Sequence, residues 1–321
     1  MLYILFTNDL PEVVHNHLSN NGTFYNTHCV NCGGICCFAD DSTYTISGKD
    51  MEELNFALDS SFKKIEMYMA DNKLVLNADK THLIVMSSDA KHRRGGNFGI
   101  FLETELKTIE PQKSEMLLGG IIQNDFKFNA HLKDDEKSVF RTLTSRVNAL
   151  SKVCAVSSFK TRKAVADGIV MSKLVYLIQL WGGCSGYLLD FLQVLQNRAA
   201  RLVTRLGWFT PTTTLLKQCG WLSVRQLVQY HSVLLAFKMM KEGKPDYFVD
   251  KFKTDFPYKT RFAAGHGVRK IETATSDPRK KGFVNRTIEV WNKLPLDLKK
   301  EISLKKFKFK LKKHIKENFP I

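Results

Sequence analysis

Alternation of apolar and polar positions marks the first third of the chain and predicts short β-strands there. Residues 35–38 and 42–47 are two such runs on either side of a tight turn, which is the pattern of a β-hairpin. The apolar letters "ICCF" at 35–38 are typical of a buried strand. Further strands are predicted within "THLIVMSS", "FGIFLETELKTI" and "EMLLGGIIQ", and the turn-rich "NADK" (77–80) precedes the first of them.

Helical spacing of apolar residues predicts one helix in this first part and several in the middle of the chain. Asp50 and Glu53 form a predicted capping box for a helix that runs to about residue 72. From about residue 128 the pattern becomes helical. Its first apolar stripe consists of Phe140, Leu143, Val147, Leu150 and Val153. Further helices are predicted at roughly 158–181, 187–206 and 221–242.

The last part of the chain combines a loop-rich stretch, 243–282, with a lysine-rich end. The segment "SLKKFKFKLKKHIKENF" (303–319) repeats apolar residues with the period of a helix, but 306–312 also alternates well enough for a strand. The fold class is therefore α+β. The predicted regions are a mixed α/β region at 1–127, an all-α region at 128–242 and a basic C-terminal region at 243–321.

Charge narrows the choice of partners. The 321 residues carry a net charge of +16, which favours a polyanion, with nucleic acid first and an anionic membrane surface second. The most apolar stretch, 168–181, contains Ser172 and Lys173 and is too short to span a bilayer, so no membrane-spanning segment is expected. Seven cysteines and an N-terminal run without a basic leader indicate reduced thiols inside the cell.

Asp40 and Asp41 are the first candidate site. Two carboxylates at a hairpin tip can approach one cation from the same side, and Mg²⁺ typically binds one or two carboxylates together with substrate phosphates. Asp is also an ordinary turn residue, so the pair by itself leaves both interpretations open. A zinc module is a third interpretation, with the ligands Cys29, Cys32, Cys36 and Cys37. Adjacent cysteines in a strand face opposite sides, which disfavours it.

Two basic segments are candidate nucleic-acid-binding surfaces. The lysines of the C-terminal segment are Lys305, Lys306, Lys308, Lys310, Lys312 and Lys313. They form either the solvated face of an amphipathic helix or a phosphate-binding surface, and we expect a mixture because the apolar stripe needs burial. In "QNRAARLVTR", Arg198, Arg201 and Arg205 are spaced for one face of a helix, where phosphate contacts and surface ion pairs are both open.

The order of these segments resembles the second half of the reverse transcriptase of non-LTR (LINE-like, jockey-type) retrotransposons. "FADD" is similar to the family's aromatic-x-Asp-Asp palm hairpin, and "NADKTHLIVMS" to the Asn-x-x-Lys-Thr segment after it. "LLGGIIQNDFKFNAHL" looks like the primer-grip strand pair with the His that opens the thumb. "LYILFTNDLPEV", "VLQNRAARLV" and "FVNRTIEVWNKLP" resemble three further segments. The six segments follow the family's order over nearly the whole chain.

This resemblance implies a partial polymerase palm of antiparallel strands and helices, then an all-α thumb and a basic C-terminal region. It implies that Asp40 is a ligand of a two-ion Mg²⁺ site, that Asp41 is its neighbour at the metal, and that Lys80 lies near the phosphates of the incoming nucleotide. The primer-grip residues would be Leu118, Gly119 and Gly120, where the glycine pair lets a nucleic-acid backbone approach closely.

The implied partners are an RNA template, a DNA primer, their hybrid and dNTPs. The implied location is the nucleus and cytoplasm, in a ribonucleoprotein. Gln123 stands where family members often have Asp, and the family's other essential aspartate, on the first palm strand, has no counterpart in these residues. The apolar start at Met1 is expected to be a truncation through a core element.

We therefore expect a fragment of an RNA-directed DNA polymerase. The reaction would be nucleotidyl transfer from dNTPs to a primer 3′-OH, and these 321 residues alone are expected to be inactive. The alternative is a non-catalytic nucleic-acid-binding remnant of a mobile element.

Overall fold

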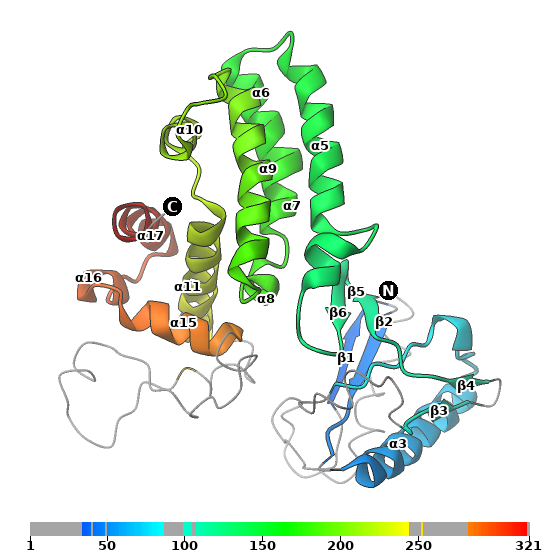
Figure 1. Ribbon diagram of the computed structural model, residues 1–321. Helices are drawn as coiled ribbons and strands as arrows, with labels where there is room; N and C mark the ends of the chain where they lie inside the picture. Colours follow the sequence, from blue (N-terminus) through cyan, green and yellow to red (C-terminus); the bar gives the residue numbers. More distant parts are fainter. Residues whose placement is uncertain are drawn as a thin grey trace. The chain divides into compact units, whose positions relative to one another are not determined.

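The computed structural model describes residues 34–39, 41–48, 50–86, 99–104, 107–243, 252 and 282–319. They belong to two compact units, Met1–Glu115 with Gln123–Phe126, and Met116–Ile122 with Lys127–Ile321. The first contains short strand pairs and one long helix, and the second is mainly helical (Figure 1). The α+β class expected from the sequence is confirmed.

The first unit is built around helix α3 (Met51–Asp71). Asp50 caps this helix, because its side chain accepts a hydrogen bond from the backbone N–H of Glu53 at 2.8 Å. Strands β1 (Gly34–Phe38) and β2 (Asp41–Thr45) form the predicted antiparallel hairpin. Buried side chains of α3 make the core together with residues of the hairpin and of the later strands.

Two strand predictions for the first unit need correction. Within the described part of "THLIVMSS" there is a single β-bridge, from Leu83 to Pro111, rather than a strand. The run "FGIFLETELKTI" forms two two-residue strands, β3 (Leu102–Glu103) and β4 (Thr108–Ile109), which pair with each other. Both corrections have the same cause. A strand forms only where another segment pairs with it, and alternation of apolar and polar residues does not predict that partner.

The apolar run "ICCF" is not a buried strand. Ile35 packs against the core, but Cys36, Cys37 and Phe38 are exposed. Adjacent residues of a strand face opposite sides, so Cys36 and Cys37 lie on different faces of the hairpin, and the described residues bury neither of them. The expectation that the two cysteines are core residues is therefore wrong.

The second unit contains most of the helices. In chain order they are α5 (Val139–Cys154), α6 (Phe159–Ala166), α7 (Ser172–Val175), α8 (Ile178–Trp181), α9 (Gly186–Thr204), α10 (Thr212–Cys219), α11 (Val224–Glu242), α15 (Phe283–Asn292), α16 (Leu296–Lys299) and α17 (Leu304–Asn318). The stripe predicted for α5 is correct except at its end, where Val153 is exposed and Cys154 faces the core. Across the described residues, none of the helices has the length and apolar character needed to cross a membrane.

Two helix predictions are wrong in their details. The single helix expected at 158–181 is interrupted by a π-helical turn, Asp167–Met171, and ends at Val175 before a residue with left-handed backbone, Leu177 (φ 55°). Helix α10 was not predicted. Helix α11 begins three residues later than expected, because Ser223 and Gln226 form a complete capping box at its start.

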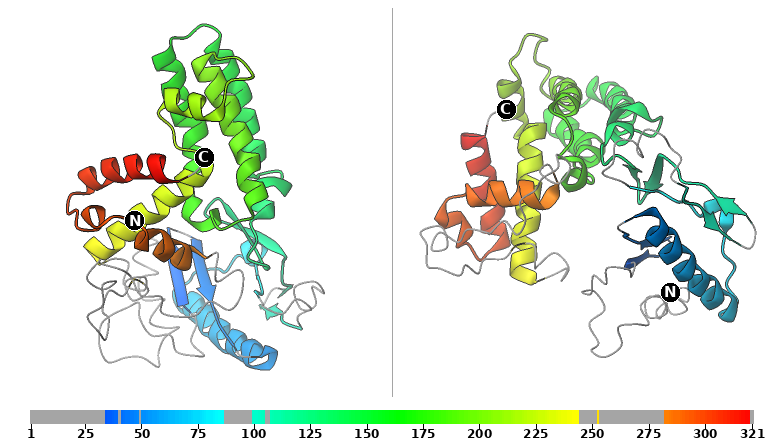
Figure 2. Two further views of the ribbon diagram at one scale, coloured as in Figure 1. Left: turned by 60° about the vertical axis from the view of Figure 1, so that its left-hand side comes forward. Right: turned by 60° about the horizontal axis from the view of Figure 1, so that its bottom comes forward.

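The lysine-rich end is a helix and packs on the same core as the middle of the chain. Phe307, Leu311 and Ile315 of α17 are fully buried. The Phe307 ring stacks on Phe237 of α11 with 3.9 Å between centroids. Figure 2 shows α11, α15 and α17 beside one another. In the described residues, the predicted C-terminal region is thus continuous with the helical region. The loops expected at 243–282 lie outside the described residues except for Phe252 and Gly282.

Candidate functional site

Strand β2 begins with Asp41, next to the tip of the β1–β2 hairpin. Phe38 pairs with Asp41, and Ala39 has left-handed backbone (φ 55°). The Asp41 side chain is exposed and has no hydrogen bond or ion pair with any described residue. Asp40 itself lies outside the described residues. Exposed carboxylate oxygens at such a tip are ligands of the kind that Mg²⁺ prefers.

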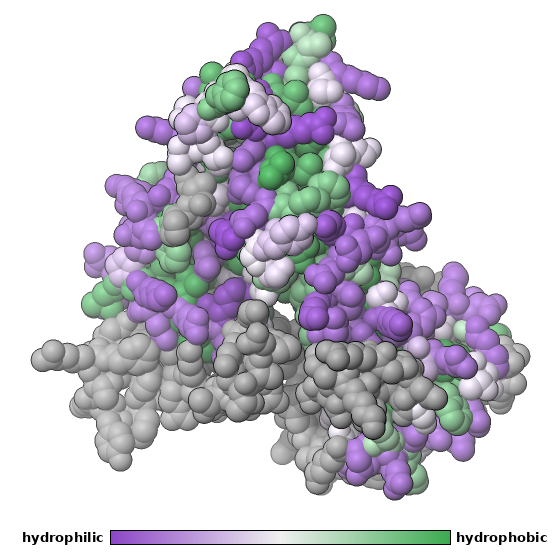
Figure 3. Space-filling model, in the orientation of Figure 1, coloured by the Kyte–Doolittle hydropathy of each residue, from purple (hydrophilic) through white to green (hydrophobic). Residues whose placement is uncertain are grey.

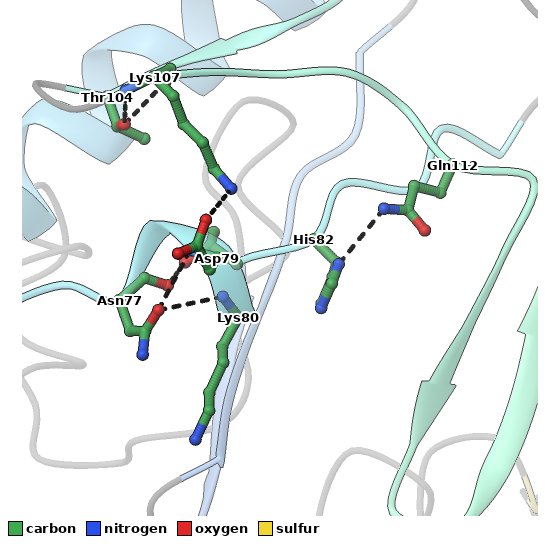
Figure 4. Close-up of polar contacts among 8 residues, drawn as sticks. Asn77, Asp79, Lys80, His82, Thr104, Lys107 and Gln112 are labelled. Atoms are coloured by element: carbon green, nitrogen blue, oxygen red, sulfur yellow. Dashed lines mark hydrogen bonds and ion pairs between the residues drawn. The ribbon is translucent and has the colours of Figure 1, made fainter.

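The segment "NADK" forms a capped 3₁₀ turn, Ala78–Lys80, that leaves Lys80 exposed. The Asn77 side chain accepts hydrogen bonds from the backbone N–H groups of Asp79 and Lys80 (Figure 4). Asp79 makes a 2.7 Å ion pair with Lys107, and the hydrogen bond in this pair lowers the pKa of the Asp79 carboxyl. The Lys80 side chain points away from that pair (Figure 4). Its ammonium group has no partner among the described residues.

Asp41 and Lys80 belong to elements anchored on one core. Ile35 and Tyr44 of the hairpin pack on the core of the first unit, and so do Leu76 and Leu83, which flank the Asn77-capped turn. The tip carboxylate and the exposed lysine thus lie within the same unit.

The second predicted site is the turn between β5 (Ser114–Leu117) and β6 (Gly120–Gln123). Leu118 and Gly119 both have positive φ, 47° and 76°, as two-residue hairpin turns require. A Cβ on Gly119 would lie 3.4 Å from the Tyr176 ring, and one on Gly120 would lie 2.6 Å from Leu177 Cδ1. The Tyr176 hydroxyl also donates a hydrogen bond to the Leu118 carbonyl.

The structure therefore gives a reason for glycine at positions 119 and 120 that the sequence did not show. The glycine pair admits two side chains of this protein, which belong to the break between α7 and α8. The close approach of a nucleic-acid backbone, which was the reason expected, stays a prediction, as does the primer-grip role.

His131 anchors the chain just after this hairpin. Its Nδ1 accepts a hydrogen bond from the backbone N–H of Ile121 at 3.3 Å, and the side chain is buried. Burial, together with the positive charge of Lys173, lowers the pKa of His131 to about 4. The imidazole is thus neutral near pH 7.

Acid should destabilise the second unit through this histidine. Between pH 6.5 and about 4 the unfolded chain binds a proton that the folded chain does not, so stability falls by about 1.4 kcal/mol per pH unit as pH drops. Urea denaturation at several pH values measures this slope. His131→Asn keeps a hydrogen-bond acceptor for the Ile121 N–H and should remove the contribution of one histidine to this slope. Buried His231, whose pKa is also lowered to about 4, should still contribute in the variant. An unchanged slope in the variant would contradict the assignment.

The three arginines of α9 are held by neutral oxygen atoms. Arg198 donates to Asn148 Oδ1 at 2.9 Å, and Arg201 donates to the Trp208 carbonyl at 3.2 Å. Arg205 is the C-cap rather than part of the helix, and it donates to the Cys154 and Ala155 carbonyls. None of the three forms an ion pair with a described residue. Of the two roles considered for these arginines, surface ion pairing is therefore not observed among the described residues. Their charges are not neutralised by described side chains.

A hollow along α5 is a feature that the sequence reasoning missed. Its volume is about 620 Å³, and its lining residues are Lys133, Phe140, Arg141, Thr144, Ser145 and Asn148. The Lys133 ammonium lies 2.8 Å from the Tyr187 hydroxyl and 4.9 Å from the centre of the Phe191 ring. In Figure 3 hydrophilic side chains gather along the α5 edge of the helical region.

A signal for this surface was present in the sequence. Between Glu136 and Glu242 the acidic residues are Asp167 and Asp190 alone. Each is paired with a basic side chain, Asp167 with Lys163 and Asp190 with Arg225. The segment between Glu136 and Glu242 thus carries a large excess of positive charge, and counting acids by segment would have located it.

Helix α17 keeps most of its lysines exposed. Lys310 is paired with Glu301 at 2.6 Å, whereas Lys305, Lys306, Lys308, Lys312 and Lys313 are exposed. Partial burial lowers the pKa of Lys312, and the charges of Lys316 and Lys163 lower it further. The charge of Asp167, which is paired with Lys163, opposes this lowering, so the exposed lysines of α17 are the source of positive charge on this surface.

The zinc interpretation stays a prediction. Cys29 and Cys32 lie outside the described residues, and Cys36 and Cys37 are free thiols. In the part of the chain that the structure describes, no three His, Cys, Asp or Glu side chains come together as metal ligands.

Comparison of the chain with protein-family models, with curated proteins and with solved structures finds no match in any of the three.

Proposed function

We propose that these residues belong to an RNA-directed DNA polymerase of the non-LTR retrotransposon type. The observation that carries the proposal is the hairpin tip, where Asp41 is exposed on the same core that holds the Asn77-capped turn with Lys80. A polymerase needs carboxylates for Mg²⁺ and a cation near the nucleotide phosphates. The order of segments in the sequence supports the same function.

The residues present fit part of a magnesium site. Asp41 offers exposed carboxylate oxygens, and Asp40 is its neighbour in the chain. Mg²⁺ held there would stabilise the charge that develops in phosphoryl transfer. Lys80 would contribute a positive charge toward the same phosphates.

The second unit would hold the template–primer duplex. The hollow along α5 presents Lys133 and Arg141, and Arg198 bonds to Asn148 in its lining. The exposed lysines of α17 add further positive charge. Basic side chains of this kind bind a duplex through its phosphates, independently of sequence.

A protein of these 321 residues should bind a poly(rA)/oligo(dT) duplex without extending the primer. The reason is that the family's aspartate on the first palm strand has no counterpart in these residues. Primer extension with Mg²⁺ and dTTP measures the activity, and fluorescence anisotropy measures duplex binding. The double variant Asp40→Asn, Asp41→Asn is the control and should bind the duplex as well as the parent protein does.

Three results would decide between the possibilities. Extension that is lost in the double variant would show that the metal site is complete and would contradict the expected inactivity. Extension that persists in it would come from a contaminating polymerase. Absence of duplex binding at low salt would reject the proposed function.

A non-catalytic nucleic-acid-binding protein is the second candidate, favoured by the concentration of basic side chains in the second unit. The two candidates differ in their use of Mg²⁺. A polymerase site should bind dNTP more tightly with Mg²⁺ present, and that gain should be lost in the double variant. A non-catalytic binder should show no such gain.

A further inference from the structure

The turn between α9 and α10 presents two large aromatic side chains to solvent. Trp208 is 73% exposed and Phe209 is 96% exposed. They occupy the central positions of a β-turn that is closed by a hydrogen bond from the Thr210 N–H to the Gly207 carbonyl at 3.1 Å. Exposed apolar side chains are common singly, but two adjacent and highly exposed rings form an apolar patch of the kind found at binding sites.

Trp208 differs from every other tryptophan in the chain. The remaining three, Trp181, Trp221 and Trp291, are buried. Arg201 holds the turn in place, because its Nε donates to the Trp208 carbonyl and its guanidinium carbon lies 4.8 Å from the Trp208 ring centre. The tryptophan is thus positioned by a cation while most of its side chain stays accessible.

The surroundings of this turn are positively charged. Arg205, three residues before Trp208, bonds to the carbonyls of Cys154 and Ala155 and so ties the turn to the loop between α5 and α6. That loop carries Val156, which is also almost fully exposed. No acidic residue lies between Asp190 and Glu242 in the sequence. A polyanion therefore complements the charge of this surface.

We propose that Trp208 and Phe209 form a stacking platform for unpaired bases of a single-stranded nucleic acid. Aromatic side chains beside arginines bind single strands because every base has a face that can stack, and the arginines contact the phosphates. Bases inside a duplex are already stacked on one another and cannot use such a platform. Under the proposed function the second unit holds the phosphates of a duplex, and this platform adds a separate site there for unpaired bases.

Tryptophan fluorescence tests this site directly. Because Trp208 is the exposed tryptophan, titration with oligo(dT) should quench its emission in a saturable way, and Trp208→Ala should abolish the quenching. Anisotropy of a fluorescein-labelled oligo(dT) should show about a 5- to 150-fold loss of affinity in Trp208→Ala, the effect of losing one stacked base. Trp208→Phe should bind within about threefold of the parent protein, because an aromatic face remains.

A matched control is available in the first unit. Phe56 of α3 is an exposed phenylalanine with Glu52, Glu53 and Asp59 nearby in the sequence. Phe56→Ala should leave oligo(dT) binding unchanged, whereas Phe209→Ala should weaken it. All four variants change exposed side chains or keep an aromatic ring, and circular dichroism verifies that they fold.

The outcomes separate this inference from the proposed function. If oligo(dT) binds through Trp208 but no duplex binds, the proposed polymerase function is rejected and the proposed stacking platform is supported. If oligo(dT) binds without changing Trp208 emission, or binds Trp208→Ala as tightly as the parent, the platform is rejected. A Trp208-dependent dimer in sedimentation, without quenching by oligo(dT), would also reject it and assign the turn to self-association.

Discussion

Phe307→Ala should destabilise the second unit by about 3 to 5 kcal/mol, the usual cost of removing a fully buried phenylalanine side chain. The ring lies between α11 and α15, stacked on Phe237 at 3.9 Å and 6.3 Å from the Trp291 ring. Its removal leaves a cavity at the point where α17 attaches to the rest of the unit. Guanidinium chloride denaturation measures the loss. All four tryptophans lie in the second unit, so their emission reports that unit alone.

The same helix contains a control of matching chemistry. Phe309 is two residues further on and is 76% exposed. Phe309→Ala should change stability by less than about 0.5 kcal/mol. Similar losses in the two variants would mean that α17 does not pack through the Phe307 face.

Affinity for an RNA–DNA hybrid should fall about 10³- to 10⁵-fold between about 50 and about 200 mM salt, provided that six to ten phosphates are contacted. The helices between Glu136 and Glu242 carry few acids, and those acids are already paired. Exposed lysines of α17 add to the same charge. Binding measured by anisotropy at several salt concentrations provides the slope of log affinity against log salt.

Lysine variants locate the surface. The triple variant Lys305→Gln, Lys308→Gln and Lys313→Gln should reduce the slope by about 2 to 3 if each lysine contacts a phosphate. The control removes the same charge from the first unit, with Lys63→Gln, Lys73→Gln and Lys113→Gln, all of which are exposed. Equal changes in both variants would show that net charge matters and the α17 surface does not. A slope near zero for the parent protein would contradict phosphate binding altogether.

The sequence predicted elements well where a local pattern was long or capped. Helix α3 follows from helical spacing and from the Asp50 cap. The hairpin of β1 and β2 follows from two short runs around a turn. In both cases residues close together in the chain supply the decisive interactions, and local patterns record these directly.

Prediction failed where a distant partner decided the outcome. Nothing near Cys36 in the chain shows which elements pack on the β1–β2 hairpin, so the apolar run was expected to be buried. The break at Tyr176 and Leu177 depends on the β5–β6 turn, which is more than fifty residues earlier in the chain.

For the candidate sites, the sequence by itself determined which chemistry is available. It places the Asp pair at a turn, Lys80 at the end of a turn-rich segment and the lysines on an amphipathic segment, because these depend on residue type and spacing. Only the tertiary structure decided that the segment 304–318 is a helix, that Gly119 and Gly120 admit Tyr176 and Leu177, and that Trp208 faces solvent. Burial and side-chain contacts depend on which distant elements meet, and alternation along the chain does not encode that.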